Sequence, residues 1–312
     1  MRVGLLSTAN INEAILGGAA DTDAAEVVAV ASRDEAKARA YAHEHGLARA
    51  HGSYDALLAD PEVDAVYVAL PNSMHVEWAV KALDAGKHVL CEKPLTRHPE
   101  DAVRAFDAAE RAGRVLQEGF MWRYLPQTQQ LLDLLPRIGE LKMVRASFSF
   151  PEREPGNVRL SAELEGGALM DVGCYCISAI RLIAGEPERV TGHQVLGGDG
   201  VDVLFTAGMT MPGGVLAHFD CGMVTSMRDE LEVVGSDATL WLDEPWKNEP
   251  PGIELRDSDG GAERFEPEQR NPYALELEEL AAVAAGEREP RFGREDAVAQ
   301  ARVIRELYEA AS

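Results

Sequence analysis

The sequence predicts an α/β protein with a doubly wound parallel sheet in its first part and an α+β domain with a largely antiparallel open sheet in its second. Up to about residue 120, strand-like runs alternate with helical patterns, and the runs are apolar throughout, as burial on both faces of a parallel sheet requires. Beyond residue 120, apolar and polar residues alternate along the runs, which is typical of a sheet with one apolar face. We therefore expect two domains, of residues 1–120 and 121–312.

The elements of the first domain follow from this alternation. Strands are expected at residues 2–7, 26–32, 65–70, 87–91 and 115–120, and helices at residues 12–20, 34–44, 75–85 and 99–112. A short additional βα unit is expected around residues 48–59. Ligands of open α/β sheets bind outside the carboxyl ends of the strands, so the residues that follow these runs are candidates for function.

The second domain is predicted to contain helices at residues 127–135, 168–184, 272–285 and 294–310, a strand at 142–150 and a loop at 151–156. Two further strands alternate with a period of two. Their apolar face carries Val201, Val203, Phe205, Ala207, Met209, Val215, Ala217, Phe219, Cys221 and Met223, and the opposite face carries Asp202, Thr206, His218 and Asp220. This pattern predicts an antiparallel sheet with one apolar side.

Composition excludes several classes of protein. The formal net charge of −23 argues against non-specific binding to nucleic acid or to an anionic membrane surface, because both need clustered cations. No apolar segment approaches the length that spans a bilayer, and Met1-Arg2 leads directly into a strand without a secretion signal. The four cysteines lack the spacing of a disulfide framework or zinc site, and the eight histidines form no ligand cluster. We expect a cytoplasmic protein without a metal.

The turn after the first strand is a candidate cofactor site. It reads Ser7-Thr8-Ala9-Asn10-Ile11-Asn12, and a dinucleotide fingerprint would place glycine at Ser7, Ala9 and Asn12. None of these positions is glycine. The small side chains at the first two still allow backbone amides to approach a pyrophosphate at the start of the next helix.

The end of the second strand bears on which cofactor is bound. Ser32-Arg33 ends this strand, and Lys37 follows in the first turn of the next helix. A site for NAD usually has an acidic residue here to bind the ribose hydroxyls, whereas a hydroxyl and two cations suit the 2′-phosphate of NADP. The residues therefore favour NADP. The alternative is an ordinary solvated helix start, because Asp34 and Glu35 neutralise part of this charge.

Two further motifs follow strands. Leu70-Pro71-Asn72-Ser73-Met74-His75 ends the strand at residues 65–70, and Asn72 suits either a cap of the next helix or a loop that touches the cofactor. Glu92-Lys93-Pro94 follows the strand at residues 87–91. Because proline restricts its own φ and the conformation of the preceding residue, Lys93 is held in a fixed direction.

Tyr175 and Lys93 together suit the oxidation of an alcohol, which needs a base for the hydroxyl proton. A phenol with a pKa of about 10 becomes such a base near neutral pH when a cation favours the phenolate. On the predicted helix, one stripe contains Gly167, Asp171, Tyr175 and Ser178, and another contains Leu169, Val172, Cys176, Ile180 and Ile183. The second is apolar core, so we expect the first to face a cleft. The alternative is that Asp171 stabilises the helix start and Tyr175 is a core phenol.

Trp122, Arg123 and Tyr124 follow the strand at residues 115–120. An aromatic ring and a guanidinium suit stacking on a sugar and hydrogen bonding to it, but packing between domains explains them equally well. Both interpretations stay open.

The order and spacing of these motifs resemble the Gfo/Idh/MocA family, which contains glucose–fructose oxidoreductase and inositol dehydrogenase. The resemblance rests on residues 7–11, 31–33, 71–75, 91–94, 120–124 and 166–175 and covers nearly the whole chain. It implies a Rossmann domain, a second domain whose open sheet often forms an oligomer interface, and NAD(P)-dependent hydride transfer at a carbinol carbon. The subgroup it resembles contains sugar 1-dehydrogenases and dihydrodiol dehydrogenases. Tyr175 stands where inositol dehydrogenases carry histidine, which favours the sugar-aldehyde branch.

We therefore expect an NADP-preferring dehydrogenase or reductase that acts on a sugar or related polyhydroxyl compound. Tyr175 is the expected acid/base, Lys93 tunes it and orients the substrate hydroxyl, and Asp171 binds the substrate. Cofactor contacts are expected from Ser7, Thr8, Ala9, Asn10, Ile11, Ser32, Arg33, Lys37, Leu70, Pro71, Asn72, His75, Glu92 and Lys93. The alternatives are a catalytically silent nucleotide-sensing regulator and a glycosidase that uses bound NAD transiently. We also expect a homodimer or homotetramer, formed through the outer sheet face that carries Leu204, Leu216 and His218.

Overall fold

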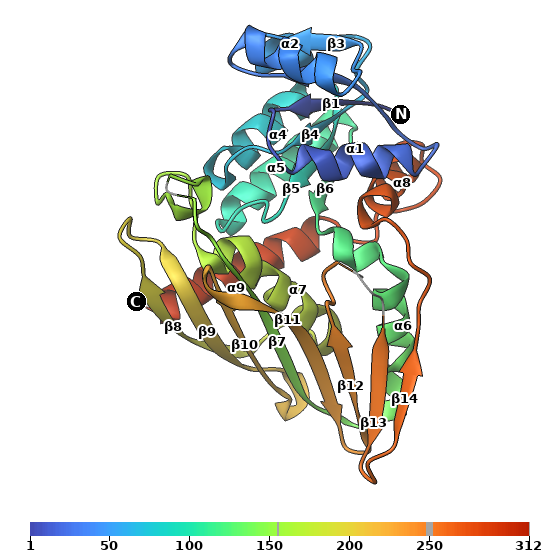
Figure 1. The fold of residues 1–312 in the computed structure, drawn as a ribbon, viewed down its shortest axis with the longest axis vertical. Helices are drawn as coiled ribbons and strands as arrows, with labels where there is room; N and C mark the ends of the chain where they lie inside the picture. Colours follow the sequence, from blue (N-terminus) through green and yellow to red (C-terminus); the bar gives the residue numbers. More distant parts are fainter. Residues whose placement is uncertain (155, 248–251, 312) are drawn as a thin grey trace. The chain divides into compact units, whose positions relative to one another are not determined.

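The computed structural model describes residues 1–154, 156–247 and 252–311, and these form two compact units (Figure 1). The first unit contains Met1–Met121 and Asn271–Val298, and the second contains Trp122–Arg270 and the chain from Ala299 onward. The division expected after residue 120 lies within one residue of the boundary after Met121, but residues 271–298, expected in the second domain, belong with the first unit. The physical reason is packing: Leu277 and Leu280 are fully buried in the first unit's core.

The first unit is built on a parallel sheet with the strand order β3-β2-β1-β4-β5-β6, which confirms the doubly wound prediction. The strands are β1 (Arg2–Leu6), β2 (Glu26–Ala31), β3 (Arg49–His51), β4 (Ala65–Val68), β5 (His88–Glu92) and β6 (Leu116–Gly119). The helices are α1 (Asn12–Ala20), α2 (Glu35–Glu44), α3 (Tyr54–Leu58), α4 (His75–Asp84), α5 (Pro99–Ala112) and α8 (Pro272–Ala284).

Each face of this sheet has its own apolar core. The core on one face includes residues of α3, α4 and α5, and the core on the other includes residues of α1 and α8. Helices α1 and α8 lie side by side, as Figure 1 shows. They approach so closely at Gly18 that a Cβ atom added there would lie 2.7 Å from Cβ of Tyr273. The strands are therefore buried on both faces, as their continuous apolar sequences require.

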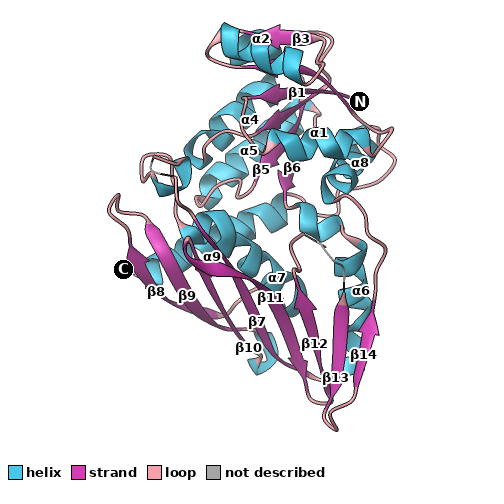
Figure 2. Cartoon of the chain, in the orientation of Figure 1, coloured by secondary structure: helices cyan, strands magenta, loops and turns pink. Residues whose placement is uncertain are grey.

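The second unit contains a sheet with the strand order β14-β13-β12-β11-β7-β10-β9-β8 (Figure 2). The strands are β7 (Leu141–Pro151), β8 (Arg189–Leu196), β9 (Asp202–Thr210), β10 (Leu216–Gly222), β11 (Val224–Gly235), β12 (Ala238–Asp243), β13 (Ile253–Asp257) and β14 (Ala262–Phe265). Only β10 and β7 pair in parallel among these described strands, so the prediction of a largely antiparallel sheet is confirmed. The unit also contains α6 (Pro126–Leu134) and α7 (Cys174–Ala184), while α9 (Arg294–Ala310) crosses the boundary between units.

The predicted alternation of buried apolar and exposed polar residues along β9 and β10 is confirmed, except at Asp202. Phe205 and Phe219 are buried, and His218 is exposed, as expected. Asp202 was assigned to the polar face but is 2% exposed, because its carboxylate accepts hydrogen bonds from the Leu169 amide and the Tyr308 hydroxyl. Of the predicted loop at residues 151–156, residue 151 ends β7 and residue 155 lies outside the described residues.

The predicted helix at residues 168–184 also needs a correction. Leu169–Gly173 forms a π-helix, and α7 begins only at Cys174. Because the π turn contains more residues than an α turn, side chains on its two sides no longer share one stripe. No helix in the described part of the chain is long and apolar enough to cross a bilayer.

Candidate active site

The turn after β1 keeps a glycine-like geometry although it contains no glycine. Ser7 has a φ of 151°, in the region that favours glycine. Its hydroxyl donates to the Ala69 carbonyl at 2.9 Å and accepts from the Ala9 amide at 3.2 Å, while the Asn12 side-chain amide donates to the Ser7 carbonyl at 2.8 Å. Among the described residues, no side chain caps the start of α1, so this helix end suits an anionic ligand.

The end of β2 presents two cations. Asp34 caps α2 by accepting from the Ala36 amide at 2.9 Å and the Lys37 amide at 3.2 Å, and Ser32 is 8% exposed. Arg33 and Lys37 are exposed, and neither forms an ion pair with the described residues. Asp34 is thus engaged with the backbone, and both cations are available to a phosphate.

The loop after β4 is fixed by His75. Asn72–Met74 forms a 3-10 turn, and the N-cap residue of α4 is Met74, whose side chain makes no capping hydrogen bond. The two roles left open for Asn72 stay predictions. The ring of His75 is 1% exposed and lies between the carbonyl oxygens of Leu70 and Pro94. It therefore connects the loop after β4 with the Glu92-Lys93-Pro94 turn after β5.

Lys93 is half-buried directly after β5, and its peptide bond to Pro94 is cis. The Lys93 amide contacts Oε2 of Glu92 at 3.3 Å, and the Tyr67 hydroxyl donates to Oε1 of the same carboxylate. Ser7, Leu70, His75, Glu92 and Lys93 thus belong to one edge of the first unit's sheet, at the carboxyl ends of β1, β4 and β5.

A buried acid on α8 adds a feature that the sequence patterns did not indicate. Both carboxylate oxygens of Glu276 are buried without a hydrogen-bond partner among the described residues. A Cβ atom added at Gly119 would lie 3.6 Å from its Oε1, so this carboxyl is close to the end of β6. Burial and, second, the charge of Glu92 raise the pKa of Glu276 well above its usual value. Its surroundings therefore favour the neutral carboxyl over the carboxylate.

In the second unit, Tyr175 lies in an aromatic cluster. Its side chain is 6% exposed, and its ring centroid is 5.3 Å from that of Phe148 and 5.8 Å from that of Trp246. Trp246 in turn lies 5.4 Å from Trp122, edge to face. Tyr175 and Trp122 are thus brought together through Trp246, which has no recognisable motif in the sequence.

Asp171 and the π-helix that carries it are also fixed by side chains that the sequence analysis missed. Arg159 donates from Nε to Oδ2 of Asp171 at 2.7 Å. Asp202 accepts from the Leu169 amide at 2.7 Å and from Tyr308 at 2.8 Å, and burial raises the pKa of Asp202 to about 6. Gly167 is required beside it, because a Cβ atom there would lie 2.2 Å from Asp202 Oδ1.

The remaining predicted residues of the second unit are buried. Ser178 was expected to face a cleft, but it is 1% exposed, because its hydroxyl accepts from Nε of the buried Arg123 at 2.8 Å. Trp122, Arg123 and Tyr124 are 1%, 6% and 6% exposed. Their contact with substrate stays a prediction.

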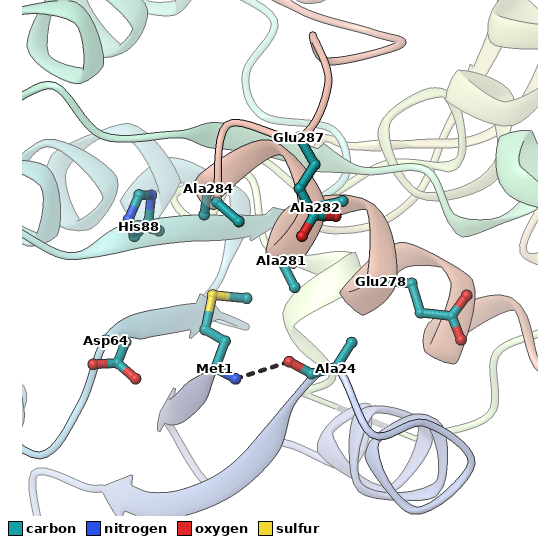
Figure 3. Close-up of a pocket in the computed structure, with 10 residues that line it drawn as sticks. Met1, Ala24, Asp64, His88, Glu278, Ala281, Ala282, Ala284 and Glu287 are labelled. Atoms are coloured by element: carbon teal, nitrogen blue, oxygen red, sulfur yellow. Dashed lines mark hydrogen bonds between the residues drawn. The ribbon is translucent and has the colours of Figure 1, made fainter.

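A pocket of about 570 Å³ opens at the other edge of the first unit's sheet, at the amino ends of β1, β4 and β5 (Figure 3). Met1, Asp64, His88 and the end of α8 line it, and the Met1 amine donates to the Ala24 carbonyl at 2.8 Å. None of the described residues that line it was predicted to be functional. No group of three described His, Cys, Asp or Glu residues is placed to hold a metal ion.

Two family models match the chain. Residues 1–120 match the Gfo/Idh/MocA oxidoreductase family with an NAD-binding Rossmann fold, and residues 134–241 match the Gfo/Idh/MocA C-terminal domain. Together they cover parts of both units, so the family indicated by the motifs is confirmed over most of the sequence.

Similar proteins match most or all of the chain. D-xylose 1-dehydrogenase (NADP(+)) 2 of Haloferax volcanii is 38% identical and covers 100% of this chain and 97% of its own. The scyllo-inositol 2-dehydrogenase (NADP(+)) of Bacillus subtilis is 31% identical over 90% of this chain and 87% of its own. A 3-ketoreductase from Actinomadura kijaniata, crystallised with NADP and TDP-benzene, is 34% identical with a TM-score of 0.92, covering 100% of this chain and 98% of its own. Variants of that ketoreductase with one tyrosine or one lysine replaced have also been crystallised.

Proposed function

The chain belongs to the Gfo/Idh/MocA family of NAD(P)-dependent oxidoreductases, and from this premise we propose that it transfers a hydride between NADP and a sugar or related polyhydroxyl compound. The names of the relatives support this substrate class, since they include a xylose dehydrogenase, an inositol dehydrogenase and a sugar ketoreductase. The proposal names NADP because exposed Arg33 and Lys37 at the end of β2 suit a 2′-phosphate.

The residues at the carboxyl edge of the first unit's sheet fit a dinucleotide. The uncapped start of α1 suits the pyrophosphate, and the glycine-like φ of Ser7 keeps the preceding turn tight. Ser32, Leu70, Pro71, Asn72 and Glu92 complete this proposed cofactor edge. The nicotinamide ring supplies hydride acceptance and donation, which no amino-acid side chain provides.

Tyr175 is the proposed acid/base. In oxidation, the carbinol carbon loses a hydride, the hydroxyl proton passes to the phenolate oxygen of Tyr175, and a carbonyl forms; reduction reverses each transfer. Lys93 supplies the positive charge that favours the phenolate and donates a hydrogen bond to the substrate oxygen. Lys93 belongs to the first unit and Tyr175 to the second. We propose that both act on the same substrate oxygen.

Asp171 is the proposed substrate-binding carboxylate. It lies one helical turn before Tyr175, and the ion pair with Arg159 orients it. A carboxylate accepts hydrogen bonds only, so it suits sugar hydroxyls next to the reacting carbon. Trp246 and Phe148, which contact the Tyr175 ring, offer apolar surfaces on which a sugar face packs.

The observation that carries the proposal is the combination of an NADP-suited strand end with a tyrosine held four residues after an oriented aspartate. It is tested by incubating the protein with NADP and a panel of aldoses and diols and following the absorbance of the reduced nicotinamide. Tyr175→Phe should lower turnover by at least about 10²-fold, and the core variant Tyr54→Phe should not. Product formation without net change in the nicotinamide would instead indicate the glycosidase, and cofactor binding without turnover the regulator.

We also propose a homodimer as the minimum assembly. The outer face of the second unit's sheet exposes large apolar side chains, with Val195 at 55% and Leu216 at 56% exposure, next to exposed His218. Such a mixed face suits a self-complementary interface. Light scattering at micromolar concentration should give the mass of two or more chains, and Leu216→Glu should lower it. The mass of one chain for the unaltered protein would contradict this proposal.

A further inference from the structure

His75 lies between two hydrogen-bond acceptors. Its Nδ1 is 2.9 Å from the Pro94 carbonyl oxygen, and its Nε2 is 2.7 Å from the Leu70 carbonyl oxygen. A carbonyl oxygen only accepts, and a neutral imidazole carries one N–H. A neutral ring would therefore leave one nitrogen lone pair facing an oxygen at hydrogen-bond distance. Both contacts are hydrogen bonds only when the ring carries two protons.

His88 in the same unit shows the opposite arrangement. The Val115 amide donates to its Nδ1 at 3.1 Å, so this nitrogen accepts and carries no proton. Burial lowers the pKa of His88, which favours the same neutral form. His88 lies at the start of β5, and the His75 ring contacts Pro94 in the turn after β5. The partners of these two rings therefore require different numbers of ring protons.

The hydrogen-bond partners favour a charged ring at His75. A charged donor forms a stronger hydrogen bond than a neutral one, and a buried nitrogen whose lone pair faces an oxygen is itself unfavourable. Burial of the ring, which is 1% exposed, and the dipole at the start of α4 both oppose the charge. Two charge-assisted hydrogen bonds from one ring offset these costs.

We propose that His75 is a doubly protonated positioning residue that ties the end of β4 to the Lys93-Pro94 turn. The Nε2–H group donates to the Leu70 carbonyl, which precedes Pro71, and the Nδ1–H group donates to the Pro94 carbonyl, which follows Lys93. Because Pro71 and Pro94 lack amide protons, these segments have fewer backbone bonds of their own to hold them. The ring therefore sets the position of Lys93. This role rests on the proposed function of Lys93, whereas the charge of the ring does not.

The charge is tested without any activity measurement. Protein labelled with ¹⁵N-histidine is examined by NMR near pH 7, where nitrogen chemical shifts distinguish N–H from a bare nitrogen. Both ring nitrogens of His75 should carry slowly exchanging protons, while Nδ1 of His88 should carry none. A bare nitrogen in His75 of the unaltered protein would overturn the proposal, whatever the enzyme's substrate.

The positioning role is tested with His75→Gln, which keeps one donor nitrogen but cannot carry a charge, and with the matched control His88→Gln. Because misplacement of a reacting group by about 1 Å costs up to about 10²-fold, kcat of His75→Gln should fall at least about tenfold while KM changes less. His88→Gln should retain kcat within about twofold. Circular dichroism and NADPH binding show that each variant is folded. An unchanged kcat in folded His75→Gln would overturn the role, and absence of turnover in the unaltered protein would overturn the proposed function instead.

Discussion

The two edges of the first unit's parallel sheet are stabilised in opposite ways. At the amino edge, charged groups have close partners: Arg2 pairs with Asp64 at 2.7 Å, and Lys87 Nζ donates to the Asp60 and Val63 carbonyls, each at 2.7 Å. At the carboxyl edge, Glu276 is buried without a hydrogen-bond partner among the described residues and is influenced by the charge of Glu92.

We interpret the amino edge as the part of the sheet that stabilises the fold and the carboxyl edge as the part that serves function. Satisfied polar groups at the amino edge lower the energy of the folded chain, whereas Glu276 at the carboxyl edge stays in a costly environment. Functional sites are where proteins keep groups with strongly shifted pKa values. We therefore expect substitutions at the two edges to change different measured quantities.

The largest difference is expected between two lysines that flank β5. Lys93→Ala should lower kcat by at least about 10²-fold with cofactor affinity nearly unchanged, because it removes the charge that favours the phenolate. Lys87→Ala should leave kcat within about twofold but lower the free energy of unfolding by about 1–3 kcal/mol, since two carbonyls lose their donor. Steady-state kinetics and urea unfolding check both variants. Equal losses of turnover would remove the distinction between the edges.

The second largest effect is expected on cofactor affinity, at Arg33 after the carboxyl end of β2. Arg33→Ala should weaken NADP binding by about 1.5–3 kcal/mol, which is about 10- to 100-fold, and should affect NAD much less. Arg39→Ala on α2, the helix that follows Arg33, is the control, because Arg39 pairs with Glu35. Fluorescence titration with both cofactors measures the affinities. Equal losses for NADP and NAD would show that Arg33 does not bind the 2′-phosphate.

Glu276 should make stability depend on pH at the carboxyl edge. Because its pKa is raised in the folded state, its stabilising contribution is complete below the ordinary pKa of about 4.3 and is lost as pH rises, by up to about 1.4 kcal/mol per pH unit. Glu276→Gln should therefore gain stability relative to the unaltered protein between pH 5 and 8, measured by urea unfolding. Glu279→Gln should instead be destabilised, since Glu279 pairs with Arg288 at 2.8 Å. Parallel pH profiles for Glu276→Gln and the parent would contradict the prediction.

Asp64 should give the smallest effect, with the opposite sign. The hydrogen bond from Arg2 lowers the pKa of Asp64 to about 2, so its contribution is present above the ordinary pKa of about 3.9 and is lost as pH falls toward 2. Both side chains are more than one third exposed, which limits the contribution to less than about 1 kcal/mol. Asp64→Asn should show a smaller fall in melting temperature between pH 5 and 3 than the parent. A larger fall would contradict the assignment.

Local patterns in the sequence were sufficient for the first unit's sheet but only partly for the second unit. The continuous apolar strands and the residues at their ends follow directly from burial on two faces. In contrast, β11 to β14 were not anticipated. In β11, Arg228, Asp229, Glu230 and Glu232 place charges on both faces, so the alternation expected for a strand is masked.

Some residues of the candidate site could be predicted from sequence motifs, and others could not. Lys93 and Tyr175 occur in recognisable motifs, whereas Arg159 and Trp246 lie in irregular segments and meet Asp171 and Tyr175 only through tertiary contacts. Ser178 was misassigned because its partner Arg123 comes from a distant part of the chain. The π-helix was missed because nothing in the apolar periodicity of residues 168–184 marks it. Similarly, Glu276 appears from sequence to be one of several acids on a solvated helix.

The close contact between Gly18 and Tyr273 has a consequence for how the protein is synthesised. Helix α8 covers α1 and supplies Leu277 and Leu280 to the first unit's core, yet it is translated after most of the second unit. A nascent chain that has reached residue 121 therefore leaves an apolar surface on its sheet exposed. We expect chaperones to bind that surface until translation passes Ala284, and ribosome-bound chains halted before α8 to be digested by protease more readily than chains halted after it.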